Sequence, residues 1–131
     1  MRKTTYEEVI RSFHGTFQDK VEIPESLERE WFVKAVGKYS FEIASIEYDE
    51  ELGEFDTKLD RYVIDTLGWM MKVFYQEREV SKANKRVSIV SKEISIDGSG
   101  SSKSAAKSEL EYAQFELERL LYKQTATSYT E

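Results

Sequence analysis

Residues 59–74 read LDRYVIDTLGWMMKVF, and their apolar side chains recur every three or four positions. This spacing places a single apolar stripe along one face of a helix. The members of the stripe are Leu59, Val63, Leu67, Met70, Met71 and Phe74. Asp56 suits the position before the helix, because its carboxylate can accept backbone N–H groups of the first turn. With the polar extension to Asn84, the pattern predicts a central helix roughly 40 Å long.

Three further helices are predicted around the central one. Thr5–Glu8 has the spacing of a capping box, which predicts a short helix over 5–14. Pro24 and the acidic residues after it suit a first helical turn and predict a second helix over 24–40. A stripe of alanine and leucine side chains predicts the last helix over about 102–123.

Other segments depart from the helical pattern. Residues 41–56 are compatible with either a continued helix or a short strand, followed by an acidic loop. β-branched side chains interleave with polar ones in 86–90 and 93–96, which predicts one or two short strands. The change of apolar phase between them indicates a turn or bulge at Ser91-Lys92.

These elements predict a mostly α fold class. We expect a small helical bundle of three to four helices with a long central helix, and a short β hairpin or strand segment before the C-terminal helix. Residues 1–123 are expected to form one domain, because no long linker interrupts them. Residues 124–131 show no periodicity and are expected to be a flexible C-terminal tail.

Composition excludes several classes of protein. The chain has 131 residues and a net charge of −6, which disfavours nucleic-acid binding through net attraction. It contains no cysteine, so disulfides and thiolate metal sites are excluded. No apolar run is long enough for a membrane span, and the N-terminus lacks a signal-peptide pattern. We therefore expect a soluble protein made in a reducing cytoplasm.

Possible catalytic and metal sites do not match their motifs. His14, the only histidine, precedes a glycine at a predicted helix end, where it suits the helix dipole. A calcium loop starting at Asp49 would put Glu54 where glycine is required. The Gly-Ser segment 98–104 lacks the glycine that precedes the lysine of a phosphate loop. The cluster Trp69–Phe74 has the spacing of a core. The sequence thus predicts neither an enzyme nor a cofactor or metal site.

Charge is distributed unevenly along the chain. Residues 47–56 carry six acidic and no basic side chains, whereas 72–92 carry six basic and two acidic ones. One interpretation is an uneven but solvated surface. The other is a head-to-tail interface between copies, in which the acidic loop meets the basic helix end. Under that interpretation the candidate interface residues are Glu47, Asp49, Glu50, Glu51, Glu54, Arg78, Lys82, Lys85, Arg86, Ile89, Ile94 and Ile96.

Two segments of the sequence carry a family resemblance: Leu67-Gly68-Trp69-Met70-Met71 and VSKEISIDG (residues 90–98). Together with the order of the elements, they resemble the head–tail connector proteins of tailed bacteriophages. These adaptor or head-completion proteins are small and mostly helical. The resemblance covers 24–123. It implies a structural virion protein that forms a homo-oligomeric ring, a dodecamer, between the portal and tail or stopper components. It also implies assembly in the bacterial host cytoplasm, no membrane contact, and a channel through which DNA passes without specific binding.

Segments 86–104 and 124–131 are the ones expected to meet neighbouring copies, the portal or tail components, because a β-branched segment can add a strand to a neighbour's sheet edge. Two alternatives stay open. The chain could be a small acidic cytoplasmic regulatory or binding module that engages a basic protein partner. It could also be an enzyme with an unrecognised site, which would require a deep pocket with perturbed carboxylates.

Overall fold

The structure, a computed structural model, describes the backbone of residues 2–93 and 99–129 and the side chains of 2–85 and 103–124. The described part is mostly helical, with one small antiparallel sheet before the C-terminal helix, which confirms the predicted fold class. In chain order the elements are α1 (Tyr6–His14), α2 (Glu25–Glu42), β1 (Tyr48–Asp49), β2 (Glu54–Phe55), α3 (Arg61–Glu93) and α4 (Ser99–Tyr129).

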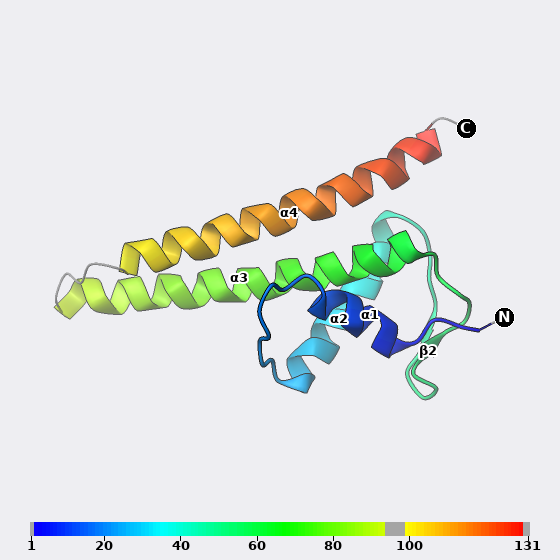
Figure 1. Cartoon of the computed structure of the whole chain (residues 1–131), viewed down its shortest axis with the longest axis horizontal. Helices are drawn as coiled ribbons and strands as arrows, with labels where there is room; N and C mark the ends of the chain where they lie inside the picture. The colour runs from blue at the N-terminus through cyan, green and yellow to red at the C-terminus, as the bar shows by residue number, and fades with distance from the viewer. Residues whose placement is uncertain (1, 94–98, 130–131) are drawn as a thin grey trace.

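Helix α3 is the central element, as the sequence predicted. It runs antiparallel to α4, and the two form a long hairpin (Figure 1). Helices α1 and α2 pack only along the half of α3 that lies near both chain ends, while the other half of the hairpin extends beyond them (Figure 1). The molecule therefore has a thick end, where all four helices meet, and a thin end formed by α3 and α4.

The core fills the thick end. The predicted stripe on α3 is buried except for Phe74, and Leu67, Met70 and Met71 are almost completely inaccessible. Helix α1 contributes Val9 and Phe13, both fully buried. Ile64, Val73 and Ala83 are further buried apolar side chains of α3. Helix α2, strand β2 and helix α4 contribute Trp31, Phe32, Ala35, Tyr39, Phe55, Ala113 and Leu117.

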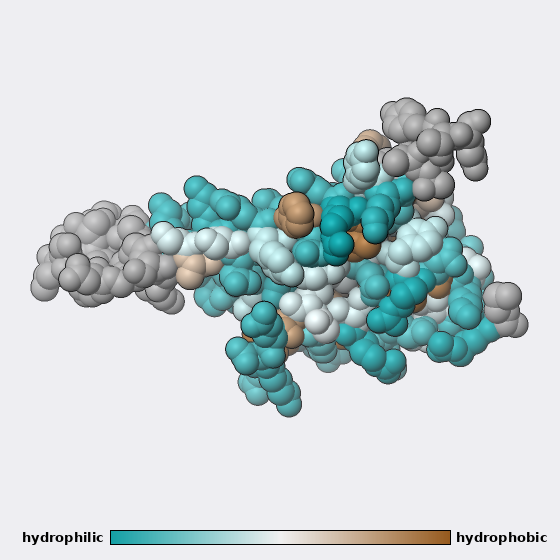
Figure 2. All heavy atoms as spheres, turned by 45° about the horizontal axis from the view of Figure 1, so that its top comes forward, coloured by the Kyte–Doolittle hydropathy of each residue, from teal (hydrophilic) through white to brown (hydrophobic). Residues whose placement is uncertain are grey.

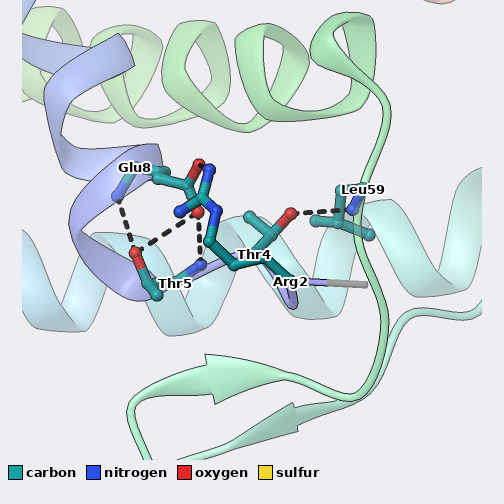
Figure 3. A network of polar contacts seen from close by, with 5 residues as sticks. All are labelled: Arg2, Thr4, Thr5, Glu8 and Leu59. Carbon is teal, nitrogen blue, oxygen red and sulfur yellow. Dashed lines mark hydrogen bonds and ion pairs between the residues drawn. The ribbon is translucent and has the colours of Figure 1, made fainter.

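A polar network fixes the start of the chain (Figure 3). The Thr5 side chain accepts a hydrogen bond from the Glu8 N–H, and the Glu8 carboxylate accepts one from the Thr5 N–H at 2.8 Å. This is the predicted capping box. Arg2 pairs with the same carboxylate at 2.9 Å. The buried Thr4 hydroxyl accepts a hydrogen bond from the Leu59 N–H at 2.7 Å, which ties the N-terminus to the segment before α3.

Helices α1 and α3 approach closely at Gly68. A Cβ atom built there would lie 2.8 Å from Ser12 Oγ and 3.1 Å from the Phe13 backbone nitrogen. A glycine on α3 is therefore required by the proximity of the α1 backbone. The Ser12 hydroxyl also donates to Asp65 at 2.8 Å, one turn before the glycine.

Several predicted boundaries need correction. Residues 86–93 continue α3 instead of forming strands, and 94–96, with Ile94 and Ile96, lie outside the described residues. A continued helix satisfies its backbone groups within the segment, whereas a strand needs an adjacent strand. The described strands are instead β1 and β2, in the region left ambiguous.

The helix ends also differ from the predictions. Asp60, not Asp56, directly precedes α3, and its carbonyl accepts from the N–H groups of Val63 and Ile64. Helix α4 continues to Tyr129, so the segment predicted as an aperiodic tail is helical up to that residue. Gln124, expected to begin the tail, is instead hydrogen-bonded into the bundle.

Candidate functional site

We call residues 47–56 the acidic hairpin. Tyr48 pairs with Phe55 and Asp49 with Glu54 in antiparallel register. Phe55 is fully buried, and the Tyr48 ring packs edge-on against Phe32 with 4.7 Å between ring centroids. Because the aromatic rings occupy the side facing the core, the carboxylates point to solvent. The exposed acidic residues are Glu47, Asp49, Glu50, Glu51 and Asp56, and Glu54 is half-buried.

The tip of the acidic hairpin is held in one conformation. The Asp49 carboxylate accepts hydrogen bonds from the N–H groups of Glu51 at 2.9 Å and Leu52 at 3.2 Å. The Gly53 N–H donates to the Asp49 carbonyl at 2.9 Å, and Gly53 has φ +68°, a value that favours glycine. This turn leaves the Leu52 side chain 66% exposed between acidic neighbours. The tip therefore presents one apolar side chain surrounded by negative charge.

The N-terminal residues hold the acidic hairpin in place. The Tyr6 N–H donates to the Gly53 carbonyl at 2.9 Å, and the Phe55 N–H donates to the Thr4 carbonyl at 2.8 Å. Thr5 and Glu54 form an antiparallel bridge between these contacts. The acidic hairpin is thereby attached to the start of α1 as well as to the core.

The described basic candidates lie on α3. Arg78, Lys82 and Lys85 are exposed, and we call them the basic stretch. Glu79 lies 3.7 Å from Arg78 and 3.3 Å from Lys82, so part of this positive charge is compensated within the helix. Such exposed pairs contribute only about 0–1 kcal/mol and remain open to exchange with other carboxylates. The backbones of Arg86 and Ile89 continue α3, and their side chains are not described.

The structure does not bring the two charged groups together within one copy. The acidic hairpin joins α2 to α3 at the thick end, and the basic stretch lies toward the thin end (Figure 1). From Arg61 to Lys82 the axis of α3 advances about 32 Å. The candidate residues therefore form two separate surfaces of opposite sign.

Lys72 does not belong to the exposed basic surface, although its charge was counted with the basic residues of 72–92. It is 5% exposed, and its ammonium nitrogen lies 3.5 Å from the centre of the Phe17 ring. Burial lowers the pKa of Lys72, and the negative charge of Glu109 opposes that effect. Sequence reasoning missed this burial because loop 15–20 and α4 cover this side of α3.

A groove among α2, α3 and α4 was also not predicted. Its volume is about 590 Å³, and its lining residues are Tyr39, Ile43, Ala44, Tyr62, Leu120, Lys123 and Gln124. The Tyr39 hydroxyl donates to Gln124 Oε1 at 2.7 Å, and Gln124 Nε2 donates to Thr66 Oγ1 at 2.9 Å and to the Leu120 carbonyl at 3.1 Å. Desolvation by burial raises the pKa of Tyr39 to about 12. These hydrogen bonds join α2, α3 and α4 and use the amide donors of Gln124 internally.

His14 joins two helices. Its Nε2 lies 2.5 Å from the Glu28 carboxylate, which connects the last turn of α1 to the first turns of α2. Glu28 is almost fully buried, whereas the His14 side chain is 54% exposed. This contact gives the histidine a structural role between α1 and α2.

Within the described residues, no group of three or more acidic or histidine side chains is arranged to hold a metal ion. None of the helices searched in the described part is long and apolar enough to cross a membrane. Comparison with protein-family models, with curated proteins and with solved structures gave no match. The function must therefore be inferred from the surfaces of this chain, and the face drawn in Figure 2 is mostly hydrophilic with a few scattered hydrophobic residues.

Proposed function

We propose that this chain is a structural protein of a tailed bacteriophage, which forms a ring between the portal and the tail, completes the head and extends the DNA channel. The observation that carries the proposal is the placement of two oppositely charged surfaces at different parts of one copy. The acidic hairpin is held rigidly at the thick end, and the basic stretch lies along α3 toward the thin end.

Two different complementary surfaces on one molecule favour a heterologous contact. The acidic hairpin of one copy then meets α3 of the next, and repetition of that step closes into a ring when the rotation permits. Opposite charges fix the register of such contacts and disfavour the pairing of like surfaces. The aromatic packing of Tyr48 and Phe55 orders the acidic hairpin when the chain folds. Little further conformational entropy is therefore lost when copies associate.

The overall charge suits a channel wall. With a net charge of −6, the protein repels DNA phosphates at distances within the Debye length of roughly 8–10 Å. Genome passage requires a surface that does not retain the phosphates. A negative ring therefore favours movement of DNA over binding of DNA.

The proposal is tested by mixing the protein with the portal of the phage that encodes it and measuring the mass of the complex by light scattering. We expect a ring on the portal that dissociates as salt rises. A double variant, Glu50→Lys with Glu51→Lys, should lose assembly and regain it with copies carrying Arg78→Glu and Lys82→Glu. Glu111→Lys, an exposed charge change on α4, is the matched control. A protein that stays monomeric and binds no virion component contradicts the proposal.

A second candidate is an acidic binding module for a basic protein. The exposed carboxylates of the acidic hairpin favour it, because a concentrated array of negative charge on a hydrogen-bonded turn attracts a basic surface. This alternative requires one dominant basic partner in a host lysate, lost with Glu50→Lys and Glu51→Lys, and no dependence on Arg78 or Lys82. Loss of binding from both sets of variants favours the ring instead.

A further inference from the structure

Lys72 carries a buried charge without a polar partner. Among the described residues, its ammonium nitrogen has no hydrogen bond and no ion pair, and it contacts the rings of Phe17 at 3.5 Å and Tyr75 at 5.6 Å. Aromatic faces compensate a desolvated cation only partly, by about 2 kcal/mol. A lysine residue that is only 5% exposed normally has a carboxylate or several oxygen acceptors as partners for its ammonium group.

A cavity of about 370 Å³ lies beside this ammonium group, between loop 15–20, α3 and α4. Phe17, Tyr75 and Tyr112 give it aromatic walls, with Ala105 and Ala106 completing the α4 side. Lys72 is one of its lining residues. Its walls are partly aromatic, and Lys72 supplies the one basic side chain among the described residues that line it.

Three carboxylates also line this cavity, and none of them pairs with Lys72. Glu79 is engaged by Arg78 and Lys82, which neutralise it. Asp19 and Glu109 are the other two, and among the described residues neither is within ion-pair distance of the Lys72 nitrogen. Burial consequently still lowers the pKa of Lys72 despite the charge of Glu109. The ammonium group lacks a close anion in the isolated chain.

We infer that this cavity receives the tip of the acidic hairpin of a second copy, with Leu52 against the aromatic wall and the Glu51 carboxylate paired with Lys72. The inference rests on the proposed function and specifies the contact that would join the copies. The tip matches the cavity at two points, because its exposed Leu52 side chain suits the aromatic wall and its adjacent carboxylates can pair with Lys72. Once the tip is bound, the Lys72 ammonium group gains a carboxylate partner, and the Leu52 side chain is removed from water.

The occupant cannot be the acidic hairpin of the same copy. Backbone hydrogen bonds to Thr4 and Tyr6 hold that hairpin at the start of α1. Lys72 lies about 16 Å along α3 from Arg61, toward the thin end of the molecule. Each copy therefore has one tip and one cavity on different surfaces, and their pairing generates a head-to-tail series.

A mixing experiment tests this geometry. The first variant, Glu51→Gln with Leu52→Ala, removes the charge and the apolar side chain of the tip. The second variant, Lys72→Met, removes the cation of the cavity and keeps an apolar side chain of similar length. Analytical ultracentrifugation should show that each variant alone associates at least about tenfold more weakly than the natural protein. A one-to-one mixture should form dimers only, because one intact tip and one intact cavity remain. Larger assemblies from either variant alone, or no dimers in the mixture, overturn the inference.

Matched controls separate the contact from general effects. Lys38→Met removes an exposed lysine on α2, and Phe41→Ala truncates an apolar side chain that is 91% exposed. Both should associate as the natural protein does. Lys72→Met should melt no lower than the natural protein, because a desolvated charge is removed. Weaker association without loss of thermal stability assigns Lys72 to the contact between copies.

A crosslinking experiment needs no variant. A mixture of ¹⁵N-labelled and unlabelled protein is treated at high concentration with a carbodiimide, which joins a carboxylate to an amine as an amide with loss of water. We expect peptide pairs that join Lys72 to Glu50 or Glu51 and contain one labelled and one unlabelled partner. Coupling of Lys72 only to Asp19 or Glu109 of its own copy overturns the inference.

The outcomes distinguish the inference from the proposed function. Rings that form on the portal, are lost with Glu50→Lys and Glu51→Lys, and are unaffected by Lys72→Met support the function and overturn this contact. Lys72 crosslinks between copies that build open chains, without portal binding, support the contact and overturn the connector function. Absence of both crosslinks and assembly overturns both.

Discussion

Two glycines in helix interiors should respond to alanine in opposite directions. Gly37 lies on the exposed side of α2, and a Cβ atom there meets nothing within 4 Å. Gly68 lies on α3 against α1, and its Cβ would lie 2.8 Å from Ser12 Oγ, 3.1 Å from the Phe13 nitrogen and 3.2 Å from the Ser12 carbonyl carbon. The same substitution thus tests the backbone preference alone at one site and the helix contact at the other.

The magnitudes follow from these surroundings. Alanine stabilises a helix interior by about 1 kcal/mol relative to glycine, so Gly37→Ala should raise the free energy of unfolding by that amount. At Gly68 the same gain is opposed by overpacking of about 1–3 kcal/mol, because two of the three close atoms are backbone. Displacing Ser12 also weakens its hydrogen bond to Asp65, worth about 1 kcal/mol. Gly68→Ala should therefore destabilise the protein by about 1–3 kcal/mol.

Urea unfolding, followed by circular dichroism and tryptophan fluorescence, measures both changes. The two variants should differ by about 2–4 kcal/mol, which is roughly 8–16 °C in Tm at this chain length. Equal slopes with urea would show that the unfolded states are comparable. If Gly68→Ala were as stabilising as Gly37→Ala, α1 would not lie against α3 at this position. That result would refute the helix packing described for the thick end.

Three further predictions concern other contacts. The pKa of Tyr39 is raised to about 12, so the folded state keeps the hydroxyl proton, whereas an unfolded tyrosine loses it above about pH 10. The free energy of unfolding should therefore fall by up to about 1.4 kcal/mol for each pH unit between those two values. Tyr39→Phe should remove that slope in alkaline unfolding and should cost about 1 kcal/mol at neutral pH, through loss of the hydrogen bond to Gln124. Thr5→Ala should cost about 1 kcal/mol in urea unfolding. The hydrogen bond from the Thr5 backbone N–H lowers the pKa of Glu8, so the stability that this pair contributes should be present above the ordinary carboxyl pKa and should decline as the pH falls below it. In acid unfolding, Glu8→Gln should therefore show a shallower fall of stability with decreasing pH. Leu67→Ala should lower the free energy of unfolding by about 2–5 kcal/mol by leaving a cavity on α3, and an effect near zero by calorimetry would contradict its full burial.

Periodicity and capping chemistry were sufficient to predict the helices. The apolar stripe of α3 and the Thr5–Glu8 capping box depend on local spacing, which the folded chain retains. Residues 86–93 show where local preference failed. Their β-branched side chains favour a strand, but they continue an existing helix, and a weak propensity does not outweigh the backbone hydrogen bonds of that helix.

The candidate site was predictable only in part. The acidic hairpin was recognised by its composition, although its strands could not be told from a continued helix. The burial of Lys72 depends on loop 15–20 and on α4, which are distant in sequence, so counting the basic residues of 72–92 could not separate it from the exposed ones. The groove that contains Tyr39 and Gln124 joins residues 85 positions apart, and no local pattern indicates such a contact.

The central position of α3 has a consequence for synthesis of the chain on the ribosome. Phe13 and Trp31 pack against α3 and are translated before that helix. About 60 residues separate Phe13 from Phe74 near the end of the buried stripe, so at roughly 5–20 residues per second the Phe13 ring waits about 3–12 s for α3. During that interval the nascent chain exposes the aromatic surface that later forms its interior. Slow codons placed before α3 should therefore lower the yield of native protein more than slow codons placed after it.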